Sequence, residues 1–205
     1  MVTQHWLVRQ LPNLLSCGRL LAGPVLIVLA LVHAEMAFTW LLIGALVSDI
    51  ADGLLARALK LQSKLGAMLD SAADVVTLVC AALGIGVFHP QVFEQHLAGC
   101  AAVIGGWSVV CVVALLRYRK LSSFHTYTSK AAGYALGFFL AALFVFDFSA
   151  LLFYLAVGLS VISSAEELAL LWQVPSWQSD VRGLWWVLRA RRMQAAVAPA
   201  SEPVT

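Results

Sequence analysis

Four aspartates lie close together in a stretch of the sequence that is otherwise apolar. Asp49 and Asp52 are three residues apart and Asp70 and Asp74 are four apart, so each pair would share one face of a helix. Charged side chains inside apolar helices are energetically costly and usually mark a functional site. The stretch is therefore the first candidate for chemistry in this chain.

A turn between two apolar segments would bring the two pairs of aspartates together. With Leu61 as the middle of the turn, Asp52 and Asp70 are each nine residues away, and Asp49 and Asp74 are twelve and thirteen residues away. Antiparallel helices would place Asp52 level with Asp70, and Asp49 level with Asp74. We expect the four carboxylates to converge within one helical turn of depth.

Four converging carboxylates would repel one another or protonate unless cations neutralised them. Oxygen ligands without His or Cys favour Mg²⁺, Mn²⁺ or Ca²⁺ over zinc, and four carboxylates are enough for two divalent ions. Two such ions are a recurrent device for phosphoryl transfer. Gly53 and Gly66 would let a diphosphate approach the helix backbone, and Arg57 could form a forked contact with a phosphate.

Two other interpretations of the aspartates remain open. They could form structural ion pairs with Arg19, Arg57 or Lys130, although four carboxylates exceed what these few cations can balance. They could also line an ion or proton pathway. Against a pathway, the carboxylates gather at one end of the segments, and no span has a Gly- or Pro-broken counterpart in the other half of the chain.

The composition predicts an all-α integral membrane protein. Hydrophobic residues make up 61% of the 205 residues, charged residues only 12%, and the mean hydropathy is +0.88, which excludes an ordinary soluble domain. Long apolar runs without an alternating polar face favour six transmembrane helices over a barrel. The expected spans are Leu14–Val32, Ala37–Ala58, Leu65–Val87, Leu97–Leu116, Thr128–Phe146 and Leu151–Trp172.

The distribution of basic residues predicts the orientation. With six spans, the N-terminus, the turn at 58–64, the loop at 117–130 and the C-terminal tail share one face, and that face holds all thirteen Lys and Arg. The opposite loops carry Glu35, Glu94 and Asp147 and no basic residue. Lys and Arg near helix ends stay on the cytoplasmic side. We therefore expect a multi-pass inner-membrane protein with both termini and the aspartates cytoplasmic.

Two segments outside the spans have the pattern of amphipathic surface helices. Thr3–Leu11 would end at Pro12, and Asp180–Met193 combines tryptophans with arginines suited to anionic lipid headgroups. We expect one membrane domain over residues 1–194 and a disordered tail over 195–205. The cysteines and histidines have no metal-ligand spacing, so no zinc site is expected.

The complete motif resembles the signature of the CDP-alcohol phosphatidyltransferase family. Every defined position is present: Asp49-x2-Asp52-Gly53-x2-Ala56-Arg57-x8-Gly66-x3-Asp70-x3-Asp74. Pro12-Asn13-Leu14-Leu15-Ser16-x2-Arg19 is similar to the entry of the first helix in bacterial phosphatidylglycerophosphate synthases.

The resemblance implies transfer from CDP-diacylglycerol or another CDP-alcohol to a hydroxyl acceptor, with release of CMP, in phospholipid synthesis. It implies that the four aspartates bind two Mg²⁺ or Mn²⁺ ions and that Asp74 also acts as the general base. The CDP moiety would contact Asp49, Asp52, Gly53, Ala56, Arg57 and Gly66. The expected partners are membrane lipid and a second copy of the chain in a homodimer, and nucleic acid is not expected.

Basic residues beyond the motif bear on the acceptor. Lys130 and Arg117 are the candidates for holding an acceptor phosphate, which favours a phosphorylated polyol such as glycerol 3-phosphate. The stretch Leu69–Val76 is more similar to phosphatidylserine synthases, so serine or another unphosphorylated alcohol is the alternative. The sequence leaves open the roles of Glu166, Glu167 and the loop around His125.

Overall fold

Apolar helices account for nearly all of the chain that the structure describes. The computed structural model describes residues 2–58, 64–119, 126–173, 184–186 and 189. Within these ranges it contains α1 (Val2–Leu31), α2 (Glu35–Ala58), α3 (Lys64–Phe88), α4 (Pro90–Tyr118), α5 (Tyr127–Val145) and α6 (Ala150–Gln173). Each is long and apolar enough to cross a membrane. The predicted all-α membrane fold with six spans is confirmed.

The first helix is longer than the sequence predicts. The expected surface helix does not end at Pro12, because α1 runs without a break from Val2 to Leu31. Proline is tolerated in membrane helices, where neighbouring groups can satisfy the backbone carbonyl that it leaves unbonded. Of the predicted C-terminal surface helix, the described residues Leu184–Trp186 and Arg189 are helical. The rest of that segment, the 195–205 tail and His125 lie outside the described residues.

The fourth helix contains a break close to its predicted start. The expected spans end at Val87 and resume at Leu97, whereas α4 already begins at Pro90. His96 has non-helical backbone angles, with φ −126° and ψ 31°, so the helix is kinked there. The hydropathy pattern therefore located the straight part of α4, from Leu97 on, and missed the helical segment before the kink.

The described chain divides into two compact units. The first consists of residues 1–97 and 137–149, and the second of residues 98–136 and 150–205. This division concerns the packing of helices. The single membrane domain over 1–194 stays a prediction.

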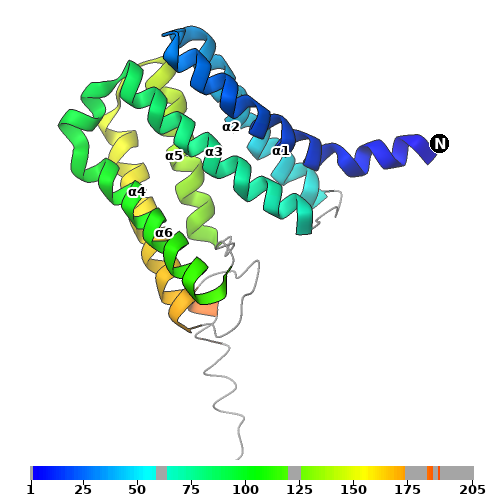
Figure 1. Cartoon of the computed structure of the whole chain (residues 1–205). Helices are drawn as coiled ribbons and strands as arrows, with labels where there is room; N and C mark the ends of the chain where they lie inside the picture. The colour runs from blue at the N-terminus through cyan, green and yellow to red at the C-terminus, as the bar shows by residue number, and fades with distance from the viewer. Residues whose placement is uncertain (1, 59–63, 120–125, 174–183, 187–188, 190–205) are drawn as a thin grey trace, which may run out of the picture. The chain divides into compact units, whose positions relative to one another are not determined.

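In the first unit, α1 packs against both α2 and α3, and the three helices run side by side in Figure 1. Leu26 of α1, Leu42 of α2 and Cys80 of α3 are almost fully buried. Gly23 lets α1 pack closely against α3, since a Cβ atom at this position would lie 2.3 Å from Cγ1 of Val76. Close packing of α1 therefore depends on the absence of a side chain at Gly23.

Replacing Gly23 with alanine is expected to lower the stability of the protein by about 1–3 kcal/mol relative to Gly18→Ala. The new methyl group meets the β-branched side chain of Val76, whose rotamer is restricted in a helix. Among the described residues, no atom of another helix lies within 4 Å of the position that a Cβ atom would take at Gly18, so Gly18→Ala controls for the higher helix propensity of alanine. Thermal unfolding of the purified proteins in detergent measures the difference; equal midpoints would contradict this account of the packing.

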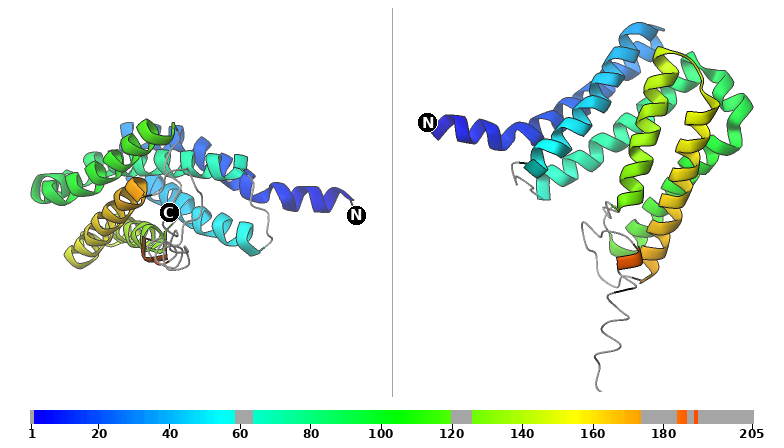
Figure 2. Two further views of the ribbon diagram at one scale, coloured as in Figure 1. Left: turned by 90° about the horizontal axis from the view of Figure 1, so that it is seen from below. Right: turned by 180° about the vertical axis from the view of Figure 1, so that it is seen from behind.

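In the second unit, α6 lies beside the part of α4 that follows the kink, as the right-hand view of Figure 2 shows. Val110, Ala114, Leu170 and Leu171 form a buried apolar cluster between the two helices. Thr126 is fully buried and caps α5, because its Oγ1 accepts a hydrogen bond from the backbone N–H of Ser129 at 3.1 Å.

Many large apolar side chains are exposed on the helices. Met36, Leu116 and Leu151, for example, are 77–79% exposed. Exposure on this scale would be unfavourable in water, but it is expected where a helix faces lipid. The surface thus agrees with the six apolar spans in assigning the protein to a membrane.

Candidate functional site

The four aspartates occupy the facing ends of two consecutive helices in the first unit. Asp49 and Asp52 lie in the last turns of α2, and Asp70 and Asp74 lie in the first turns of α3. Asp52 is buried, while the Asp49, Asp70 and Asp74 side chains are between one third and one half exposed. The hairpin of α2 and α3 therefore places all four carboxylates in one region that is partly exposed.

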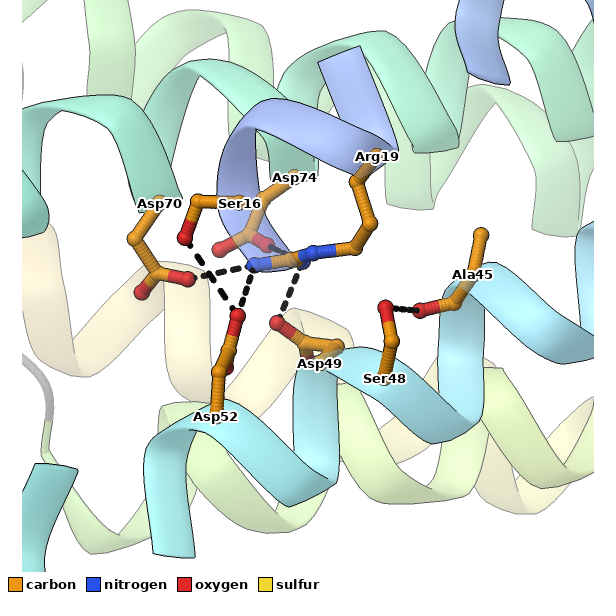
Figure 3. A network of polar contacts seen from close by, with 8 residues as sticks. All are labelled: Ser16, Arg19, Ala45, Ser48, Asp49, Asp52, Asp70 and Asp74. Carbon is orange, nitrogen blue, oxygen red and sulfur yellow. Dashed lines mark hydrogen bonds and ion pairs between the residues drawn. The ribbon is translucent and has the colours of Figure 1, made fainter. Parts of the chain in front are cut away.

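A residue from the first helix lies at the centre of this cluster. The guanidinium of Arg19, on α1, points into the space between α2 and α3, and all four carboxylates converge on it (Figure 3). Its side chain is only 2% exposed. Ser16, one turn earlier on α1, donates a hydrogen bond to Asp52 at 3.3 Å.

The ion pairs follow the pairing that the hairpin geometry predicts. Nη1 of Arg19 donates to Asp49 at 2.5 Å and to Asp74 at 2.8 Å. Nη2 donates to Asp52 at 2.9 Å and to Asp70 at 2.6 Å. Each nitrogen thus bridges one carboxylate from α2 and one from α3, and the two bridged pairs are those expected to lie level with each other.

The donor set fits a divalent cation. Asp49, Asp70 and Asp74 each offer an oxygen atom, and these three atoms all lie within 4.8 Å of one another. Hard carboxylate oxygens are the ligands that Mg²⁺, Mn²⁺ and Ca²⁺ prefer. Asp52 is outside this group of three but reaches the same guanidinium.

The charge balance limits the purely structural interpretation of the aspartates. That interpretation named Arg19 among three possible partners, and Arg19 does form ion pairs with all four carboxylates. One guanidinium nevertheless balances only one of four negative charges. Uncompensated charge is costly in a partly dehydrated site, so the cluster retains a demand for further cations.

The other motif residues lie on the same two helices. Gly53 follows Asp52 in α2, and Gly66 lies in the first turn of α3; both are partly buried. Ala56 and Arg57 are in the last turn of α2, and their side chains lie outside the described residues. The backbone of all the motif residues therefore belongs to the end of α2 or the beginning of α3.

The two candidate acceptor residues belong to the second unit, whereas the aspartates belong to the first. Lys130 is in the first turn of α5, with its Nζ 5.9 Å from the centre of the Tyr127 ring. Arg117 is in the last turn of α4, and its Cζ lies 5.7 Å from the centre of the Tyr118 ring. Their role in acceptor binding stays a prediction.

Glu166, whose role the sequence leaves open, connects three parts of the second unit. One carboxylate oxygen accepts a hydrogen bond from the backbone N–H of Leu184 at 2.8 Å, and the other accepts one from the hydroxyl of Thr128. The carboxylate on α6 thereby holds the start of α5 and the segment Leu184–Trp186. Trp186 also packs on Tyr127, with ring centres 5.7 Å apart.

Sequence reasoning placed the aspartates but missed the central position of Arg19 and the contact of Ser16. The available signal was the charge itself: Arg19 lies inside the apolar span Leu14–Leu31, where a cation requires a partner. The sequence named candidate partners without choosing among them.

Comparison with known proteins relates this chain to one family. The family model described as CDP-alcohol phosphatidyltransferase matches residues 9–162. A protein of Mycobacterium tuberculosis named putative cardiolipin synthase is 36% identical over 137 residues, which cover 64% of this chain and 63% of that protein. No solved structure matches.

Two further relatives differ in the acceptor that their names imply. A CDP-diacylglycerol–glycerol-3-phosphate 3-phosphatidyltransferase of Cereibacter sphaeroides is 44% identical over 75 residues, covering 35% of this chain and 34% of that protein. A CDP-diacylglycerol–serine O-phosphatidyltransferase of Mycobacterium bovis is 32% identical over 128 residues, covering 62% and 43%. The chain thus spans less than two thirds of the length of these relatives.

Proposed function

Since this chain belongs to the CDP-alcohol phosphatidyltransferase family, we propose that it transfers a phosphatidyl group from CDP-diacylglycerol or a related CDP-alcohol to a hydroxyl acceptor and releases CMP. The observation that carries the proposal is the convergence of the four motif carboxylates, from α2 and α3, around one point. Family membership favours this transferase over the carboxylate-based ion transporter.

The substrate would reach the carboxylates from the membrane. In the proposed orientation both termini and the site lie on the cytoplasmic side of an inner membrane, as the positions of the basic residues suggest. The diacylglycerol tails stay among lipids, while the CDP group approaches the ends of α2 and α3. A homodimer is the proposed assembly, on the family resemblance.

Asp49, Asp52, Asp70 and Asp74 would hold two Mg²⁺ or Mn²⁺ ions. When bound, such ions would neutralise the diphosphate oxygens and acidify the acceptor hydroxyl. Gly53 and Gly66 lack side chains and would let the diphosphate come close to the helix backbone. Together with Asp49, Asp52, Ala56 and Arg57 they form the proposed CDP-binding set.

Asp74 is the proposed general base. Its carboxylate would take the proton of the acceptor hydroxyl, whose oxygen attacks the lipid-bearing phosphorus. A new phosphorus–oxygen bond forms as the bond from that phosphorus to the bridging oxygen breaks, and CMP leaves with the bridging oxygen. Asp74 is about half exposed, which gives a small acceptor access to it.

Glycerol 3-phosphate or a similar phosphorylated polyol is the preferred acceptor, with Lys130 and Arg117 binding its phosphate. The relative from Cereibacter sphaeroides supports this choice by its name. The mycobacterial relatives support two other candidates: phosphatidylglycerol, which gives cardiolipin when phosphatidylated, and serine.

CMP release by the purified full-length protein tests the function. The assay contains CDP-diacylglycerol, Mg²⁺ or Mn²⁺, and glycerol 3-phosphate, phosphatidylglycerol or serine in separate reactions. We expect acceptor-dependent CMP release, fastest with glycerol 3-phosphate. If none of the acceptors supports release, the proposed enzyme activity fails; if serine or phosphatidylglycerol is preferred, only the acceptor assignment changes.

Replacing Lys130 with alanine is expected to raise KM for glycerol 3-phosphate by about tenfold or more, because a charge-assisted hydrogen bond to the phosphate is lost. The kcat should change little, since Lys130 is not proposed to touch the reacting atoms. Steady-state kinetics with varied acceptor concentration separate the two constants. Arg189→Gln, which removes a cation that lies over the Trp185 ring, is the control for lost positive charge. An unchanged KM in Lys130→Ala would remove Lys130 from the acceptor site.

A further inference from the structure

We propose that Arg19 is an exchangeable internal cation of the aspartate cluster, which competes with divalent metal ions for the carboxylates and leaves them when the ions bind. The inference rests on the proposed metal binding and adds to it a residue outside the Asp49–Asp74 motif. Arg19 would set how tightly the protein binds its ions.

Arg19 and divalent metal ions need the same ligands. The two terminal nitrogens of Arg19 make four ion pairs of 2.5–2.9 Å with the four aspartates. Three of these aspartates form the only group of candidate metal ligands among the described residues. An oxygen that accepts a short hydrogen bond from a guanidinium has less electron density to offer an ion, so the two contacts exclude each other in part.

The charges of the cluster also oppose simultaneous binding of Arg19 and two metal ions. The four ionised carboxylates carry four negative charges, which two divalent ions balance without Arg19. If the guanidinium stayed between the carboxylates, it would lie next to both ions. Like charges at contact distance in a partly dehydrated site repel strongly. Arg19 cannot escape this repulsion by losing its proton, since a guanidinium stays charged in proteins. It must therefore move away.

Arg19 does not satisfy all of its hydrogen-bond donors in this position. Its Nε atom is buried and has no hydrogen-bond partner among the described residues. The residue as a whole is only 3% exposed. A buried donor without a partner is unfavourable. The position between the aspartates therefore satisfies the charge of Arg19 but not all of its donors, which lowers the cost of leaving that position.

Manganese binding to the full-length protein in detergent tests the proposal without any activity measurement. Free Mn²⁺ is followed by electron paramagnetic resonance during titration, with no nucleotide present. We expect Arg19→Gln to bind Mn²⁺ about tenfold more tightly than the unmodified protein, because the competing cation is gone. Arg19→Lys should lie between the two, since an ammonium keeps the charge but cannot bridge both aspartate pairs.

Two controls separate this proposal from the proposed metal site. Asp70→Asn should weaken Mn²⁺ binding, whereas Arg189→Gln should leave it unchanged. If Asp70→Asn weakens binding but Arg19→Gln binds Mn²⁺ no more tightly than the unmodified protein, competition by Arg19 is refuted while the metal site stands. If none of the proteins binds Mn²⁺, both proposals fail.

Thermal unfolding gives a second measurement. It compares how far Mn²⁺ shifts the unfolding midpoint of each protein, so the variants need not be equally stable without metal. In EDTA, Arg19→Gln should unfold at a lower temperature than the unmodified protein, because the carboxylates have lost their cation. On addition of Mn²⁺, its midpoint should rise by more than that of the unmodified protein, since tighter binding stabilises the folded state further. An equal or smaller rise would overturn the proposal.

Discussion

Changing Asp74 to asparagine is expected to slow CMP release by about 10²–10⁴-fold, the usual effect of losing a general base. Asparagine is nearly the same size and keeps one oxygen that can accept the hydrogen bond from Arg19, which aspartate accepts at 2.8 Å. It cannot take up the acceptor proton. The helices should therefore stay in place while the proton transfer is lost.

The matched control is Asp147→Asn. Asp147 follows α5, and its Oδ1 accepts a hydrogen bond from the backbone N–H of Phe148 at 2.7 Å, a bond that asparagine can also accept. The control makes the same chemical change outside the motif and should leave CMP release unaltered. Release by Asp74→Asn at the control rate would exclude Asp74 as the base. Because Asp74 is also a proposed metal ligand, Mn²⁺ binding by the variant should be measured in parallel.

Removal of divalent metal ions is expected to slow CMP release by about 10²-fold or more, and added Mg²⁺ or Mn²⁺ should restore it. The reason is the charge of the site. The diphosphate adds negative charge to a cluster in which one guanidinium already faces four carboxylates. Without divalent ions the substrate would be repelled, and nothing would stabilise the leaving phosphate.

The measurement is CMP release after dialysis against EDTA, followed by stepwise addition of single metal ions. Zn²⁺ should restore little, because the cluster offers hard oxygen ligands and no described His or Cys belongs to it. Undiminished activity after complete removal of metal would contradict the proposed role of the aspartates. Asp52→Asn should raise the Mg²⁺ concentration that is needed, which would connect the metal requirement to this particular cluster.

Much of the fold followed from the sequence because membrane helices obey simple rules. Twenty or so consecutive apolar residues must form a helix when no water is available to the backbone, and this rule located all six spans. It could not locate the kink at His96 or the continuation of α1 through Pro12. Both depend on local backbone geometry, which hydropathy does not report.

The sequence by itself determined the aspartate cluster. Helical spacing sets the two aspartates of each pair on one face, and a short turn sets the two pairs level, so the arrangement follows from neighbours along the chain. The ion pairs agree, since each terminal nitrogen of Arg19 joins one aspartate of α2 to one of α3.

Only the tertiary structure decided which cation lies among the aspartates. Arg19 is separated from them by 30 to 55 residues and reaches them because α1 packs closely against α3 at Gly23. Such a contact depends on the shapes of two helix surfaces, which no pattern along one helix records. The sequence thus specified the four carboxylate ligands. The packing of α1 placed the guanidinium of Arg19 between them, and on our proposal metal ions must compete with this guanidinium.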